Sequence, residues 1–234
     1  MVSCIIPAYN EARTIAEVIG TAVGHPRITE IIVVDDGSTD ATSKVLETMT
    51  DKKLKVIPHS VNRGKKEAVR TGLMHATQPY VLFLDADLVG LSHHDMDVLI
   101  EPVLNKHIDM TLSSRKNTTL YAMYFNMIGV HFLTGDRCAK KEIFDYGYTL
   151  GTTGYGIEVL LNDYLLKNNI SFLPISIGAR SLSKLAKRGV IIGLRDDLRM
   201  LIQIIKASSF RTLVRQSVVM PRRIKKYRAR LQTK

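Results

Sequence analysis

Short apolar segments alternate with helical patterns through the first half of the chain. Strands are expected at residues 3–6, 30–34, 54–57 and 80–84, and helices at residues 11–23, from Ser38 onward and at residues 64–76. The strand segments are apolar throughout instead of alternating with polar residues, which indicates strands buried on both faces. We therefore expect an α/β fold with a doubly wound, mainly parallel sheet flanked by helices.

The second half of the chain is less regular. Helices are expected at residues 92–104, 120–132, 157–167 and 190–207, strands at 110–112 and 171–175, and a polar, basic loop at 178–189. The longest nearly apolar stretch, residues 120–133, is shorter than the roughly 20 residues that a membrane-spanning helix requires. We expect no signal peptide, because the chain opens directly on a strand pattern.

The two cysteines, Cys4 and Cys138, lie far apart and neither has the spacing of a metal-ligand pair. Cys4 lies inside an apolar segment and is expected to be a small core residue. A reducing compartment fits this cysteine usage better than an oxidising one. Together with the absence of a signal peptide, this predicts a cytoplasmic protein.

Polar residues follow each of the four predicted strands of the first half. The first strand is followed by Pro7, Ala8, Tyr9, Asn10 and Glu11, the second by Asp35 and Asp36, the third by Asn62, Arg63, Gly64 and Lys65, and the fourth by Asp85, Ala86 and Asp87. Ligands of open parallel sheets bind at the carboxyl ends of the strands. These segments are therefore expected to form one polar crevice.

Asp85 and Asp87 are the candidate metal ligands. Two carboxylates two residues apart, just past a strand, can reach one Mg²⁺ or Mn²⁺ ion and leave positions for phosphate oxygens and water. Such an ion neutralises the charge that develops on a diphosphate leaving group. The alternative is a solvated turn, but the five apolar residues before Asp85 favour a pair fixed at the edge of the sheet.

Asp36 and Lys65 also have two possible roles. Asp36 could form a turn and helix cap, or its carboxylate could accept hydrogen bonds from a base N–H or a ribose hydroxyl. Lys65 could lie in a solvated helix start, or it could help to hold a diphosphate at the N-terminus of a helix.

The positive charge is concentrated at the C-terminus. The chain carries a net charge of +11, yet residues 1–197 contain 22 basic and 22 acidic residues and are neutral. We place a boundary near Ser208, between residues 1–207 and a basic, amphipathic tail at 208–234. Apolar residues interspersed with Arg and Lys suggest an interfacial helix on an anionic membrane surface. The alternative is a core helix followed by a solvated tail.

Nucleic acid is a less favoured partner for this tail, because Phe210 and Tyr227 are its only aromatic residues that could stack on bases.

Four segments identify a resemblance to a known family. SCIIPAYNEARTI, IIVVDDGSTDAT, NRGKKEAVRTG and VLFLDADL occur in the order and spacing of family 2 glycosyltransferases with the GT-A fold. The resemblance is strong over residues 1–90 and weaker to about residue 177. It implies a nucleotide-binding half at 1–90, an acceptor half at 91–207, and inverting, metal-dependent transfer of a hexose from a UDP- or GDP-sugar.

The resemblance also assigns site residues. It implies that Pro7, Tyr9, Asn10, Glu11 and Asp36 line the nucleoside pocket, that Lys65 lies near it, and that Asp85, Ala86 and Asp87 hold Mg²⁺ or Mn²⁺ and the diphosphate.

Two further segments, LTGDRCAKKEIF and GYGIEVLLNDYLLKNNISFLPISI, resemble the acceptor half of the family. A hydroxyl acceptor requires a carboxylate base, for which Asp136 and Glu158 are the candidates, with Asp136 preferred. A phosphate acceptor is already anionic, and then Arg115 and Arg137 would bind it. The SSR sequence that ends at Arg115 resembles the Ser-Arg of polyprenyl-phosphate sugar transferases.

The chain departs from that pattern in two places. No His follows His131, although many relatives carry a histidine metal ligand in the loop after the last strand. Leu-Val-Gly-Leu follows Asp87, where many polyprenyl-phosphate enzymes have Gln-His-Pro-Pro.

The preferred acceptor is a lipid-linked one, a polyprenyl phosphate or a glycolipid, used at the inner face of a membrane. The alternatives are a soluble enzyme that acts on a small anionic acceptor such as a phosphoglycerate, a nucleotidyltransferase, and a non-catalytic nucleotide-sugar-binding protein. A nucleotidyltransferase usually has a Gly-rich N-terminal loop, which IIPAYNEA lacks.

Overall fold

The protein is described by a computed structural model that covers residues 1–114, 134–149, 157–181 and 210–232. The helices expected at 120–132 and 190–207, the boundary near Ser208, and Arg115 lie outside the described residues.

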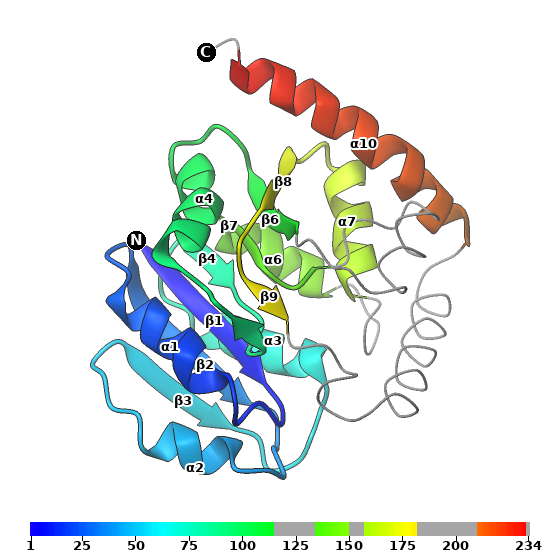
Figure 1. The fold of residues 1–234 in the computed structure, drawn as a ribbon. Helices are drawn as coiled ribbons and strands as arrows, with labels where there is room; N and C mark the ends of the chain where they lie inside the picture. The colour runs from blue at the N-terminus through cyan, green and yellow to red at the C-terminus, as the bar shows by residue number, and fades with distance from the viewer. Residues whose placement is uncertain (115–133, 150–156, 182–209, 233–234) are drawn as a thin grey trace.

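A seven-stranded sheet forms the centre of the protein (Figure 1). Its order is β3 (Leu54–Pro58), β2 (Ile28–Asp35), β1 (Val2–Ala8), β4 (Tyr80–Phe83), β7 (Arg137–Lys140), β6 (Met110–Ser114) and β8 (Phe172–Ser176). All pairings are parallel except those of β7, which is antiparallel to both neighbours. The predicted mainly parallel α/β fold is confirmed.

Helices cover both faces of the sheet. The described helices are α1 (Ile15–Gly24), α2 (Thr42–Glu47), α3 (Lys65–His75), α4 (His93–Leu104), α6 (Lys141–Thr149), α7 (Ile157–Lys167) and α10 (Phe210–Gln232). Helices α1 and α4 pack together on one face, while α3 and α6 pack together on the other. Ser92 and Asp95 form a capping box that fixes the start of α4.

Two predicted helix starts were too early. Helix α1 begins at Ile15 instead of Glu11, and α2 begins at Thr42 instead of Ser38. The residues in between form loops tied to one another, because the Asn10 side-chain oxygen accepts a hydrogen bond from the Thr39 amide at 2.8 Å. The polar residues that resembled helix caps are used to join these loops.

Strand β7 and helix α6 were not predicted, nor was the short antiparallel pair β5 (Leu88–Val89) and β9 (Arg180–Ser181). The β7 sequence, Arg-Cys-Ala-Lys, is flanked by charges and does not resemble a buried strand. It is nevertheless central, between β4 and β6, and its arginine is buried.

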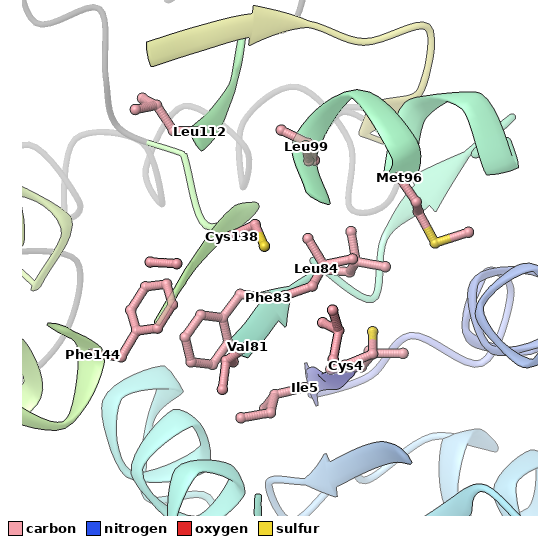
Figure 2. Close-up of a cluster of buried hydrophobic side chains, with 14 of the residues drawn as sticks. Cys4, Ile5, Val81, Phe83, Leu84, Met96, Leu99, Leu112, Cys138 and Phe144 are labelled. Carbon is pink, nitrogen blue, oxygen red and sulfur yellow. The ribbon is translucent and has the colours of Figure 1, made fainter. Parts of the chain in front are cut away.

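The core between sheet and helices is apolar and closely packed (Figure 2). Cys4 and Cys138 are both fully buried and unpaired with each other, and both lie opposite Leu82 in the sheet. Burial raises the pKa of both thiols above the usual range. A Cβ atom at Gly72 of α3 would lie 2.4 Å from Ile5 Cγ2, so this glycine lets α3 approach β1.

The basic tail forms helix α10, as expected, and this helix packs on the protein (Figure 1). Gln216, Met220, Ile224 and Tyr227 form a buried stripe along it. The stripe faces α7 and the edge strand β8, where Tyr227 meets the ring of Phe172 edge-to-face at 5.9 Å. Within the described ranges, no helix is long and apolar enough to cross a membrane.

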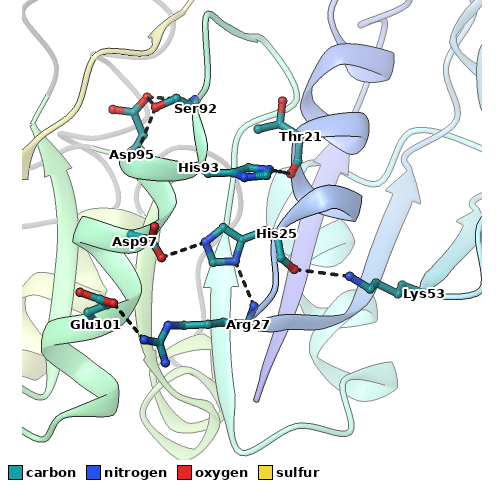
Figure 3. A network of polar contacts seen from close by, with 9 residues as sticks. All are labelled: Thr21, His25, Arg27, Lys53, Ser92, His93, Asp95, Asp97 and Glu101. Atoms are coloured by element: carbon teal, nitrogen blue, oxygen red, sulfur yellow. Dashed lines mark hydrogen bonds and ion pairs between the residues drawn. The ribbon is translucent and has the colours of Figure 1, made fainter.

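A polar network links α4 to the end of α1 and the start of β2 (Figure 3). His25 is fully buried at its centre. Its Nδ1 accepts from the Arg27 amide at 3.3 Å, so its Nε2–H donates to Asp97 at 3.1 Å and the ring is neutral. Burial lowers the pKa of His25, although Asp97 partly opposes this effect. Arg27 and Glu101 form an ion pair beside it.

We predict that His25 contributes to acid sensitivity. Because its folded-state pKa is lowered, its contribution to stability is complete above the unfolded pKa of about 6.5 and is lost as the pH falls below it. The His25→Gln variant can still donate to Asp97 but cannot titrate. In urea unfolding it should lose less stability than the wild type between about pH 7.5 and about pH 5.5.

The control is His94→Gln, at an exposed position of the same region. Equal losses of unfolding free energy in the two variants would contradict this role of His25.

Candidate active site at the carboxyl end of the sheet

The sheet brings the predicted strand ends together. Strands β3, β2, β1 and β4 are adjacent and parallel, so the segments that follow them leave the same edge. The Asp36 amide donates to the Ala8 carbonyl at 2.8 Å, and the Leu84 amide to the Ile5 carbonyl at 3.1 Å, which extends the pairing to the edge itself. The four polar segments therefore start from the same edge of the sheet, as expected.

The segments after β1 and β2 are joined through Asn10. Asn10 has a positive φ of 58°, and its side-chain oxygen accepts from the Thr39 and Asp40 amides. The Glu11 amide donates to the Thr42 hydroxyl at 2.8 Å. Tyr9 is 38% exposed at this edge and Pro7 is half-buried. The predicted contacts of these residues with a nucleoside remain predictions.

Asp36 is buried beneath the loop that leads to α3. Its carboxylate accepts from the Arg63 amide at 3.0 Å and the Gly64 amide at 2.8 Å, and it lies 2.7 Å from His59 Nδ1. Only 2% of Asp36 is exposed. In this structure its carboxylate holds the loop, and a contact with a base or ribose remains a prediction.

His59 is a site residue that the sequence analysis missed. It follows β3 directly, and its second ring nitrogen lies 2.9 Å from the Thr71 hydroxyl of α3. His59 thus links Asp36 to α3, whose first residue is Lys65. Its position two residues beyond the strand predicted at 54–57 was the available signal.

Lys65, Asp85 and Glu158 form a half-buried charge cluster. Lys65 Nζ lies 2.9 Å from Asp85 Oδ1 and 3.4 Å from Glu158 Oε1. The three side chains are 33%, 22% and 10% exposed. Asp87, also half-buried, follows two residues later. Two carboxylates thus lie beside one ammonium, and the excess negative charge favours a cation.

The donor set fits a hard divalent cation. Asp85 and Asp87 supply carboxylate oxygens, the ligands that Mg²⁺ and Mn²⁺ prefer. No cluster of three or more His, Cys, Asp or Glu suited to a metal ion occurs among the described residues. Asp85 and Asp87 remain the candidate ligands from the described part of the chain.

Gly135 leaves room for this cluster. A Cβ atom at this position would lie 2.4 Å from Asp85 Oδ1 and 2.5 Å from Lys65 Nζ. A side chain at this position would displace the Asp85 carboxylate and the Lys65 ammonium from where they lie, so the glycine forms one wall of the site. The LTGDRCAKKEIF segment that contains this glycine resembles the acceptor half of the family, but the sequence gave no physical reason for the glycine.

The structure does not bring Asp136 to the surface of the site. It has no exposed area, its Oδ1 accepts from the Asp85 amide at 2.9 Å, and its Oδ2 accepts from the Ser113 hydroxyl at 2.8 Å. Both carboxylate oxygens of Asp136 thus accept hydrogen bonds inside the protein, and its assignment as a base that contacts an acceptor stays a prediction. Ser113 gave no signal in the sequence, because its role depends on the register of β6.

Arg137 does not face the crevice either. It is 1% exposed, donates from Nε to the Thr134 carbonyl at 2.9 Å and from its guanidinium to Asn162 at 2.9 Å. The contact ties β7 to α7, one turn beyond Glu158. Its contact with an acceptor phosphate stays a prediction, and Arg115 lies outside the described residues.

We predict that Gly135→Ala impairs the site. The added Cβ would force Asp85 and Lys65 to move, so Mn²⁺ affinity in the presence of UDP or GDP should fall by roughly 10-fold to 100-fold. Calorimetric titration with Mn²⁺ measures this loss. The control is Gly20→Ala, where a Cβ meets nothing within 4 Å. Unchanged Mn²⁺ affinity in Gly135→Ala would show that Gly135 does not shape the metal site.

Relatives of this chain are known sugar transferases. It is 36% identical over 244 residues to dolichyl-phosphate beta-glucosyltransferase of Saccharomyces cerevisiae, covering 84% of this chain and 72% of that protein. It is 29% identical over 174 residues to the UDP-Glc:alpha-D-GlcNAc-diphosphoundecaprenol beta-1,3-glucosyltransferase of Escherichia coli. That match covers 74% of this chain and 64% of that protein.

Solved structures share the fold. Glucosyl-3-phosphoglycerate synthase from Mycobacterium tuberculosis, in complex with Mn²⁺, UDP-Glc and phosphoglyceric acid, matches with a TM-score of 0.67 at 20% identity. The match covers 88% of this chain and 79% of that one. The same enzyme with Mg²⁺ and UDP matches with a TM-score of 0.60 at 23% identity, over 84% and 79% of the two chains.

The chain also matches the profile of a protein family. The profile of Glycosyl transferase family 2 matches residues 3–122, which include β1 to β4 and both Asp85 and Asp87. The match extends over more than half of the chain, and it agrees with the yeast relative and with the GT-A type sheet. The chain belongs to glycosyl transferase family 2.

Proposed function

We propose that this protein transfers a hexose from a nucleotide-diphosphate sugar, bound with Mg²⁺ or Mn²⁺, to a lipid-linked acceptor. The observation that carries the proposal is the cluster of Lys65, Asp85 and Glu158 at the carboxyl edge of the sheet. Asp87 follows Asp85 by two residues along the chain. Family membership supports the reaction class.

Asp85 and Asp87 would hold the metal ion. When bound, the ion would neutralise charge on the diphosphate as it leaves the sugar. Lys65 is the first residue of α3, whose N-terminal amides and dipole favour an anion. In the structure its ammonium balances Asp85, and with a donor present it can turn to a phosphate oxygen.

UDP-glucose is the first donor to test. The Escherichia coli relative carries UDP-Glc in its name, and the structurally similar synthase was solved with UDP-Glc and Mn²⁺. The nucleoside would lie beside Tyr9, which is exposed at the edge of the crevice next to the loop that Asn10 fixes.

A phosphate acceptor fits the site better than a hydroxyl acceptor. Asp136 is buried, and the Glu158 carboxylate, 10% exposed, lies 3.4 Å from the Lys65 ammonium. An acceptor phosphate oxygen is anionic and needs no carboxylate base, whereas a hydroxyl does. The yeast and human relatives are named dolichyl-phosphate beta-glucosyltransferases, which supports a polyprenyl phosphate.

A phosphoglycerate is the second candidate acceptor. It shares the anionic phosphate chemistry, and the similar solved structures contain phosphoglyceric acid. The two candidates differ in the lipid chain, so parallel assays with dolichyl phosphate, undecaprenyl phosphate and 3-phosphoglycerate separate them.

We predict transfer of labelled glucose from UDP-glucose to a polyprenyl phosphate when Mn²⁺ or Mg²⁺ is present. Replacing Asp87 by Asn should lower the rate at least about 100-fold, because the metal loses a charged ligand. The matched control is Asp145→Asn, at an exposed carboxylate of α6. Equal rates in Asp87→Asn and Asp145→Asn would overturn the metal role of Asp87. Transfer to 3-phosphoglycerate alone would overturn the lipid acceptor.

We also propose that α10 places the enzyme on an anionic membrane surface, at its cytoplasmic face. Its buried stripe faces the protein, and the opposite side is exposed and basic. The exposed basic residues are Arg211, Arg215, Arg222, Lys225, Lys226 and Arg228. Val214 and Val218, 47% and 44% exposed, add apolar area on the outside of the helix.

Truncation is a poor test of this contact, because removing α10 would also expose the apolar surface of α7 and β8. The better variant is Arg222→Glu, Lys225→Glu and Lys226→Glu combined, which leaves the buried stripe intact. Each basic residue contributes about 1 kcal/mol on anionic lipid, so binding to phosphatidylserine vesicles should fall at least about 100-fold.

The matched control carries Lys52→Glu, Lys55→Glu and Lys106→Glu, at exposed lysines elsewhere on the protein. Vesicle flotation compares the three proteins, with neutral phosphatidylcholine vesicles as the reference. If both triple variants lose vesicle binding to the same extent, net charge rather than α10 directs the protein to the lipid.

A further inference from the structure

We infer that Asp136 is a positioning residue: its carboxylate fixes the backbone of Asp85, and through it the metal-binding segment from Asp85 to Asp87. This inference rests on the proposed function. It replaces the assignment of Asp136 as a base with a role derived from its contacts.

The Asp85 amide lies where the sheet ends. Strand β4 ends at Phe83, which pairs with Arg137 of β7, and the Leu84 amide still donates to Ile5 of β1. The next amide, that of Asp85, donates to the Asp136 side chain at 2.9 Å. This contact extends the hydrogen bonding by one residue and sets the direction in which the chain continues to Asp87.

Asp136 is itself held from two sides. The Ser113 hydroxyl of β6 donates to its second carboxylate oxygen at 2.8 Å and lies 2.7 Å from the Thr134 hydroxyl. The Ser113 amide donates to the Asp136 carbonyl at 3.0 Å. Because the residue has no exposed area, these contacts are shielded from water, and loss of a partner would leave a buried group unsatisfied.

The same segment sets the side chain of Asp85. Gly135, directly before Asp136, gives space to the Asp85–Lys65 ion pair. Two adjacent residues thus control the backbone and the carboxylate of one metal ligand. Arg137, the next residue, binds Asn162 of α7, the helix that carries Glu158. The loop before β7 therefore aligns Asp85, which follows β4, with Glu158 of α7.

Two variants separate the positioning role from the role of a base. In Asp136→Asn the amide oxygen can accept from the Asp85 N–H, and its NH₂ can donate to Ser113. In Asp136→Ala both contacts are lost. Positioning predicts that the Asn variant keeps its rate within about 5-fold, whereas the Ala variant loses Mn²⁺ affinity by roughly 10-fold to 100-fold.

A base role predicts a different pattern. Neither Asn nor Ala can accept a proton, so both variants should lose kcat by roughly 100-fold to 10,000-fold, while Mn²⁺ affinity in the presence of UDP stays unchanged. That pattern would overturn the inference. Urea unfolding of each variant shows whether a loss of Mn²⁺ affinity comes from partial unfolding.

A measurement that does not depend on turnover keeps the inference testable if the proposed function fails. Amide hydrogen exchange reports the hydrogen bond between the Asp85 amide and Asp136 directly. The Asp85 amide should exchange at least about 10-fold faster in Asp136→Ala than in the wild type and stay protected in Asp136→Asn. Equal protection in Asp136→Ala would refute the positioning role. Failure of the wild-type protein to bind any nucleotide sugar would instead refute the proposed function.

Discussion

Asp85 is held by two interactions of different kinds. Its carboxylate forms an ion pair with Lys65, and its backbone amide donates to the buried Asp136. An unpaired carboxylate in a half-buried position is costly, and a cation close by reduces that cost. The Lys65 ammonium fills this place in the structure, and a metal–diphosphate pair would fill it during the proposed reaction. The strand ends, the loop before β7 and helix α7 are arranged around this residue.

The antiparallel strand β7 makes this arrangement possible. It inserts between β4 and β6 and brings residues 134–137 back to the edge where β4 ends. A parallel strand would bring its N-terminal loop to the opposite edge, away from Asp85. Gly135 and Asp136 reach Asp85 only because β7 runs in this direction.

Helix α10 shows how one amphipathic sequence can serve two surfaces. Its stripe of Met220, Ile224 and Tyr227 packs on α7 and β8, and Gln216 donates to the Val159 carbonyl at 2.7 Å. Val159 adjoins Glu158, so the packing of this helix reaches the residue beside Lys65. The apolar pattern that suggested a lipid-binding face is largely used within the protein, and the basic face remains outside.

The sequence by itself determined the parallel half of the sheet and the order of its polar strand ends. Continuous apolar segments depend on local pattern, which is why β1 to β4 could be predicted. The same pattern predicted that Lys65, Asp85 and Asp87 follow strands at one edge of the sheet. Only the tertiary structure decided where Asp136, Arg137 and Gly135 lie and which residues they contact. Their burial follows from strand β7, a short strand flanked by charges that pairs with segments distant in sequence. No local sequence pattern specifies which partners a buried polar side chain contacts.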